Sequence, residues 1–137
     1  MPDSYSLRSI GVVRSLLADR SEAPRQPDED APAAEIVLDD DVCPALVGIE
    51  PGDRIELLTW LHLADRSTLS THPRGDASRP LTGVFATRSP DRPNPVGLHT
   101  VTVTAVLGNV VRVDGLEAVD GTPVIDIKPS LGGLGLR

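Results

Sequence analysis

Short runs of alternating apolar and polar residues, separated by glycine and proline turns, constrain the fold of this chain more than any other feature. Residues 99–105 read HTVTVTA, which places Val101 and Val103 on one side of a strand and threonines on the other. Gly108-Asn109 then gives a two-residue hairpin signal that leads into the valine-rich run 110–113. The pattern is typical of half-buried antiparallel strands.

The rest of the chain has the same short strand-like runs. They lie at residues 9–14, 35–38, 54–62, 81–87 and 124–128, with short helical turns expected at 44–49 and 65–69. The sequence shows neither a long amphipathic helix nor a βαβ unit, and turn signals recur roughly every 8 to 15 residues. We therefore predict an all-β, barrel-like fold with minor helix.

Length and composition limit the class of protein. A chain of 137 residues fits one domain, which we place at 1–137. It has no apolar run long enough to span a membrane and no signal-peptide pattern, so we expect a soluble cytoplasmic protein that needs no membrane. One cysteine excludes an internal disulfide, and the scattered histidines form no zinc motif, so we predict no metal.

The most specific segment is 83–97, which reads GVFATRSPDRPNPVG. Its three prolines fix the backbone and leave the remaining amide and carbonyl groups outside any sheet ladder. Arg88 and Arg92 each offer a planar fork to a carboxylate, phosphate or carbonyl, and Asn94 can both donate and accept. The alternative is a rigid connector with solvated arginines, but the density of fixed backbone and forked donors favours a binding loop.

The acidic charge is unevenly spread. The formal net charge is −7, yet residues 26–53 hold nine acids and no lysine or arginine, and the remainder holds thirteen bases against eleven acids. The basic stretch 66–92 includes the proline-rich loop. This asymmetry permits an anionic partner without requiring one, because a large basic patch is absent from the sequence.

Two further segments carry polar residues in ambiguous positions. In VIDIK, alternation places Val124, Asp126 and Lys128 on one face of the strand. If that face is solvated, Asp126 and Lys128 form a weak ion pair, and if it lines a cavity, they form a site. We favour the solvated face. The turn Asp120-Gly-Thr-Pro is more often a backbone cap than a catalytic group. His62 ends a strand, where a histidine is more often partly exposed than functional.

Together these motifs resemble the TrmO family, also called YaeB-like proteins. GVFATRSPDRPNPVGLH, DGTPVIDIKP and an upstream PRQP occur in the family's order, and the resemblance extends from residue 9 to residue 129. It implies a single-sheeted β-barrel that forms a homodimer. It also implies an S-adenosyl-L-methionine-dependent methyltransferase that modifies N6-threonylcarbamoyladenosine next to the anticodon of threonine tRNA.

The resemblance also implies site residues. The cofactor contacts would be Pro24, Arg25, Gln26, His62, Leu63, Arg88, Leu98, Asp120, Gly121, Thr122 and Pro123. For methyl transfer, the predicted catalytic residues are Asp126, Arg92 and Asn94: Asp126, or alternatively Asp120, would accept a proton, and the arginine would hold a carboxylate or phosphate.

Two other functions stay open from the residues. The first is methylation of a small-molecule nitrogen, such as an imidazole or amine metabolite, which the acidic balance and the compact length favour. The second is a non-catalytic module or dimeric scaffold that binds S-adenosylmethionine. The presence of both arginine-bearing loops argues against this second alternative.

Overall fold

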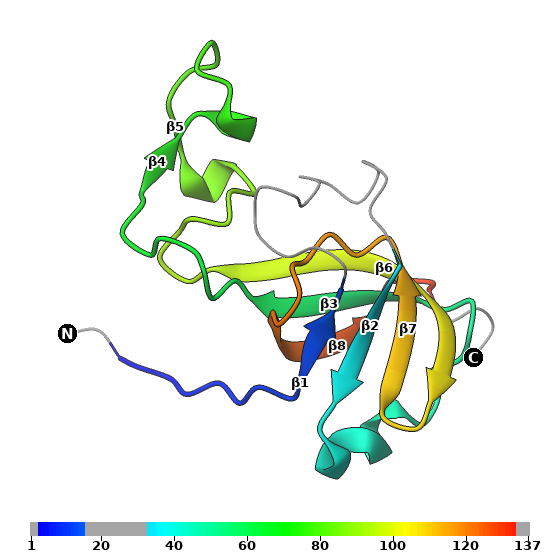
Figure 1. Ribbon diagram of the computed structural model, residues 1–137. Helices are drawn as coiled ribbons and strands as arrows, with labels where there is room; N and C mark the ends of the chain where they lie inside the picture. Colours follow the sequence, from blue (N-terminus) through cyan, green and yellow to red (C-terminus); the bar gives the residue numbers. More distant parts are fainter. Residues whose placement is uncertain (1–2, 16–32, 134–137) are drawn as a thin grey trace.

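The computed structural model, which describes residues 3–15 and 33–133, is a closed barrel with one projecting extension (Figure 1). The barrel order is β1-β2-β7-β6-β3-β8, and the paired strands are antiparallel. Its strands are β1 (Gly11–Arg14), β2 (Ala34–Leu38), β3 (Arg54–Trp60), β6 (Val96–Leu107), β7 (Val110–Asp114) and β8 (Pro123–Pro129). The prediction of an all-β barrel is confirmed.

Alternation along the strands fills the barrel with aliphatic side chains. Ile36 of β2 and Ile55 and Leu57 of β3 have no exposed surface. Val101 and Val103 of β6 also point inward, whereas the neighbouring Thr100 and Thr102 are partly exposed, so the predicted half-buried strand is confirmed. Burial of these chains, rather than of aromatic rings, is the main source of stability.

β6 is longer than the predicted run because it serves two neighbours. It pairs with β3 up to Thr102 and with β7 from that residue onward, and its register shifts between Val103 and Ala105. Such a bulge bends a strand and increases its twist, which helps the sheet to close. The hairpin after β6 is confirmed, with Gly108 at φ 62° as a tight turn requires.

Because of a second bulge, the predicted face of Val124 in β8 is wrong. The register between β3 and β8 shifts between Leu58 and Thr59, so that Leu58 faces Asp126 while Thr59 faces Val124. The extra residue reverses the alternation: Val124 is fully buried and the Asp126 side chain is 47% exposed. Val124 and Asp126 therefore do not share a face, and Asp126 forms the predicted surface ion pair with Lys128 at 2.9 Å.

Residues 61–95, which we call the arm, project from the end of the barrel where β3 stops and β6 begins (Figure 1). The arm contains β4 (Ser70–Thr71), η3 (Pro73–Gly75), β5 (Thr82–Gly83) and η4 (Val84–Ala86). The strand predicted at 81–87 is wrong beyond Gly83, because β5 has only β4 as a neighbour and the chain then turns into η4. The helical turn predicted at 65–69 is also absent from this described segment.

The opposite end of the barrel is covered by the 3-10 helix η2 (Asp40–Leu46), which begins earlier than the turn predicted at 44–49. Val42 and Leu46 of this helix pack against the core. Among the described residues, no helix has the length and hydropathy of a membrane span.

Candidate functional site

Several predicted cofactor residues meet at the end of the barrel that carries the arm. Thr59 pairs with Val124, Trp60 pairs with Val96, and the amide of Leu61 donates to the carbonyl of Pro95 at 2.8 Å. The turn after β3, which includes His62 and Leu63, therefore shares this end with the starts of β6 and β8. Both side chains are exposed, and Leu63 retains 52% of its surface.

Arg88 and Leu98 come together although ten positions separate them. Nη2 of Arg88 donates to the carbonyl oxygen of Leu98 at 2.9 Å, which fixes the RSP turn of the arm on β6. A guanidinium has five N–H groups, and this is the one hydrogen bond of Arg88 within the described parts of the chain. The fork can therefore hold its position and still donate to a ligand, beside a Leu98 side chain that is 46% exposed.

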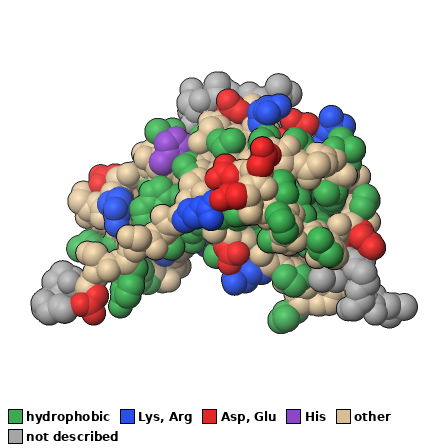
Figure 2. All heavy atoms as spheres, turned by 90° about the horizontal axis from the view of Figure 1, so that it is seen from below, with side chains coloured by type: hydrophobic (Ala, Val, Ile, Leu, Met, Phe, Trp, Pro, Cys, Tyr) green, Lys and Arg blue, Asp and Glu red, His purple; other side chains and the backbone are tan. Residues whose placement is uncertain are grey.

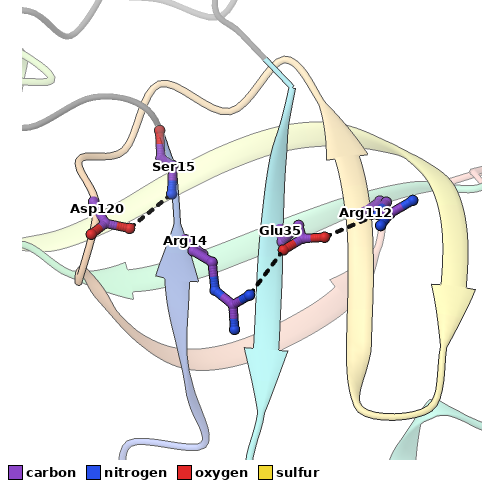
Figure 3. Close-up of polar contacts among 5 residues, drawn as sticks. All are labelled: Arg14, Ser15, Glu35, Arg112 and Asp120. Atoms are coloured by element: carbon purple, nitrogen blue, oxygen red, sulfur yellow. Dashed lines mark hydrogen bonds and ion pairs between the residues drawn. The ribbon is translucent and has the colours of Figure 1, made fainter.

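The turn at Asp120 is attached to the end of β1. Oδ1 of Asp120 accepts a hydrogen bond from the amide of Ser15 at 2.9 Å (Figure 3), and the amide of Gly121 donates to Val13 at 2.8 Å. Gly121 has φ 86°, a conformation that favours glycine. The hydroxyl of the buried Thr122 donates to a backbone carbonyl within the turn at 2.8 Å. Asp120 is thus the exposed polar side chain of a firmly held turn.

A row of charges that the sequence analysis missed lies beside this turn. Glu35 accepts from Arg112 at 2.9 Å and pairs with Arg14 at 3.4 Å, across three adjacent strands (Figure 3). These residues and Ser15 line a surface cavity of about 360 Å³. Only the register of β1, β2 and β7 brings them together, so spacing along the chain gave no signal.

Arg92 is used to fold the arm. Its two terminal nitrogens donate to the carbonyl oxygens of Val84 at 2.8 Å, Thr87 at 3.1 Å and Ser89 at 3.0 Å. The forked guanidinium predicted to hold a ligand is therefore bonded to its own loop. A catalytic role for Arg92 stays a prediction.

Asn94 takes part in a cluster at the base of the arm. Its Oδ1 accepts from Nη2 of Arg66 at 3.0 Å, and Nε of Arg66 donates to the carbonyl of Pro93 at 2.7 Å. The same guanidinium lies 5.1 Å from the ring centroid of Trp60, a cation–π distance. Sequence reasoning missed Arg66 and Trp60; the one available signal was a tryptophan at the end of a predicted strand.

Asp126 lies apart from the other two predicted catalytic residues. It sits on the outer face of β8, where it pairs with Lys128 and accepts from the amide of Ile127 at 2.9 Å. Its described contacts do not include Arg92 or Asn94. The structure thus does not join the three predicted catalytic side chains into one group.

Pro24, Arg25 and Gln26 lie outside the described residues, so their predicted cofactor contacts stay predictions. Within 3–15 and 33–133, no group of three or more His, Cys, Asp or Glu side chains is arranged to hold a metal ion.

Comparison with known proteins identifies the family. Residues 12–133 match the family described as tRNA-methyltransferase O N-terminal domain. The chain belongs to this TrmO family. A probable S-adenosyl-L-methionine-binding protein of Methanothermobacter thermautotrophicus is 47% identical over 123 residues, which are 90% of this chain and 88% of that protein. An S-adenosyl-L-methionine-binding protein of Archaeoglobus fulgidus is 42% identical over 122 residues, covering 89% of this chain and 86% of that protein.

Solved structures of the TrmO family share the fold. The crystal structure of TrmO from Pseudomonas aeruginosa aligns with a TM-score of 0.76 at 31% identity, and the alignment covers 96% of this chain. It covers 57% of the chain in that crystal, so the present chain spans a little over half the length of the solved TrmO.

Proposed function

We propose that this protein binds S-adenosyl-L-methionine at the arm end of the barrel and is a methyltransferase of the TrmO type. The observation that carries the proposal is the meeting of Arg88 with Leu98 at the barrel end that also holds the turn after β3 and the Asp120–Pro123 turn. The names of the relatives from M. thermautotrophicus and A. fulgidus support the cofactor.

The residues at this end suit the chemical groups of the cofactor. The fork of Arg88 matches a carboxylate, and the exposed carboxyl of Asp120 accepts from an ammonium or from ribose hydroxyls. Leu63 and Leu98 offer apolar surface to an adenine ring. We place the further contacts at His62, at the Gly121–Pro123 backbone and at Pro24, Arg25 and Gln26. The bound cofactor supplies a methyl group already activated by its sulfonium.

The chain's own task is then to orient the acceptor and exclude water. Asp120 lies at the site and is better placed than Asp126 to accept a proton from an acceptor nitrogen. Arg92 and Asn94 act by holding the arm in the shape that presents Arg88. In this proposal Arg92 is a positioning residue, and Asp126 has a role only if the acceptor extends over the outer face of β8.

For the acceptor, we propose N6-threonylcarbamoyladenosine of tRNA, in line with the family description. Its threonyl carboxylate suits an arginine fork, and the paired Arg14 and Arg112 lie beside the Asp120 turn, where they can contact phosphate. The net charge of −7 supports a second candidate, a small-molecule nitrogen, because a strongly acidic surface slows the approach of nucleic acid.

We also propose a homodimer. The arm exposes large apolar side chains, among them Leu69 at 69%, Leu81 at 63% and Phe85 at 84%. Seen from below, the molecule shows acidic and basic side chains among exposed hydrophobic ones (Figure 2). A second copy covering the arm would remove its apolar side chains from water.

Calorimetric titration with S-adenosyl-L-methionine tests the cofactor, with Arg88→Ala as the variant and Arg79→Ala as the matched arm control. Loss of the fork should weaken binding about tenfold or more, since a hydrogen bond to a charged group contributes about 1.5–3 kcal/mol. The control should bind as the wild type does. Absence of binding at millimolar cofactor would refute the proposal. Methyl transfer to threonine tRNA, compared with transfer to a metabolite pool, then decides between the two acceptors.

A further inference from the structure

A buried chain of three polar side chains lies inside the barrel at the same end as the proposed site. Nδ1 of His99 is 2.6 Å from Oε1 of Glu117, and its Nε2 is 2.7 Å from Oγ1 of Thr59. Thr59 has no exposed surface and His99 is 5% exposed. An ionised carboxylate can only accept, so Nδ1 donates to Glu117 and, in the neutral ring, Nε2 accepts from the hydroxyl.

Gly97 of the proline-rich motif makes room for this chain. A Cβ atom at that position would lie 2.3 Å from Oγ1 of Thr59 and 2.7 Å from Nε2 of His99. Any side chain there would therefore displace the hydrogen-bonded pair. The glycine that ends the PNPVG sequence is explained by the buried contact, not by its own backbone conformation.

The arrangement resembles a nucleophile relay but cannot act as one. Thr59 is fully enclosed, so its hydroxyl cannot reach a substrate. Oε2 of Glu117 is buried and has no hydrogen-bond partner within 3–15 and 33–133, so the contact with His99 is the described polar anchor of this carboxyl. Buried carboxylates without such a partner are strongly disfavoured. The chain therefore fixes where Glu117 lies.

Glu117 belongs to the loop that carries the proposed cofactor turn. Residues 115–122 cross from β7 to β8 at the arm end of the barrel (Figure 1). Leu116 and Ala118 pack into the core on either side of Glu117, and the Asp120 turn follows directly. The apolar neighbours supply burial without direction, whereas the bond to His99 selects one position of the loop.

We propose that Glu117, His99 and Thr59 are positioning residues, which hold the 115–122 loop so that Asp120 and Gly121 are aligned for the cofactor. The proposal rests on the proposed binding of S-adenosyl-L-methionine for its functional consequence. Its structural part, the immobilisation of the loop, stands independently. Breaking the chain should loosen the loop and weaken cofactor binding while the barrel stays folded.

The chain offers matched controls on the outer face of the same strands. Oε1 and Oε2 of Glu56 accept from the hydroxyl of Thr100 at 2.9 Å, and Oε1 also accepts from Ser130 at 2.8 Å. This outer cluster contains the same carboxylate and hydroxyl chemistry as the inner chain, but these side-chain hydrogen bonds join β3, β6 and Ser130 and do not involve the 115–122 loop. Thr100→Val and Glu56→Leu therefore match Thr59→Val and Glu117→Leu.

The experiment measures amide hydrogen exchange without ligand and the affinity for S-adenosyl-L-methionine. Thr59→Val and Glu117→Leu, which removes the acceptor for Nδ1 of His99, should speed exchange in residues 116–122 and weaken binding, each about tenfold, the range seen for residues that act through a neighbour. Thr59→Ser, which keeps the hydroxyl, should restore both values. The two outer variants should match the wild type.

Three results would overturn the proposal. Unchanged exchange in both inner variants would show that the loop is held by its apolar residues alone. Failure of Thr59→Ser to restore the wild-type exchange, or unfolding of both inner variants, would show that the chain supports the barrel as a whole. If the wild type does not bind the cofactor, the proposed function fails, and the exchange data still decide whether the chain holds the loop.

Discussion

The barrel and the arm are held together by different forces. In the barrel, alternate residues of every strand enter a common apolar interior, and Ile36, Ile55 and Leu57 have no exposed surface. In the arm, residues 61–95, the buried residues are Val84 and Pro95. Its shape depends on arginines that donate to backbone carbonyls and on prolines that restrict the chain.

Because of this difference, the barrel and the arm have different local stabilities. Apolar burial stabilises the barrel strongly but without direction, so the barrel tolerates a polar chain in its interior. The strands stay in register because a shift by one residue would turn their apolar side chains to the other face. Forked hydrogen bonds are directional and exposed to competition from water, so they specify a loop shape with little reserve of stability. We therefore expect the arm to open locally while the barrel remains folded.

The largest expected effect compares the loss of stability when a buried leucine of the barrel and an exposed leucine of the arm are each shortened. Leu57→Ala, in the core, should lower the free energy of unfolding by about 2–5 kcal/mol, because it removes buried surface and leaves a cavity. In the monomer, Leu81→Ala, at a side chain that is 63% exposed in the arm, should change this free energy by less than about 0.5 kcal/mol. Urea unfolding followed by circular dichroism measures both. Similar losses at the two positions would show that the arm has an apolar core of its own.

A smaller effect should appear in the arm alone. Arg92→Lys keeps the charge but cannot reach three carbonyls at once, so the free energy of local opening at residues 84–89 should fall by about 1–3 kcal/mol. Hydrogen exchange resolved by residue measures this opening. Arg79→Lys is the control, because Arg79 makes one exposed ion pair with Asp76 at 3.8 Å, which contributes little. An equal loss of protection in the barrel strands would mean that the two regions unfold as one unit.

The same difference between barrel and arm explains which strands could be predicted from the sequence. Most barrel strands follow from alternation and turn residues, since the period of two is written directly in runs such as 99–105. The solvated position of Asp126 was predicted, but the placement of Val124 on the same face was wrong because a bulge, which depends on the pairing of β8 with β3, reverses the alternation. In the arm, a pair of two-residue strands, β4 and β5, carries no periodic signal at all.

The candidate site was predictable only where motifs are contiguous. The loop 83–97 and the Asp120 turn could be found as motifs, but not the partners that give their side chains a role. Arg92 looked like a ligand fork because a sequence cannot show that nearby carbonyls already satisfy it. His99 and Glu117 gave no signal, because β6 and the loop between β7 and β8 bring them together only in the folded barrel.

The smallest expected effect concerns the stability of the arm at acidic pH. Hydrogen bonds from the hydroxyl and the amide of Ser67 hold the pKa of the exposed Asp65 below its usual value of 3.8. Because the pKa is lowered in the folded arm, the bonds add stability above about pH 3.8, and that stability is lost as the pH falls through the folded value. Ser67→Ala should raise the pKa of Asp65 toward 3.8, measured by NMR titration, and should leave the barrel resonances unchanged. Movement of barrel resonances along the same titration curve would show that the arm and barrel are coupled, against the division drawn from their contacts.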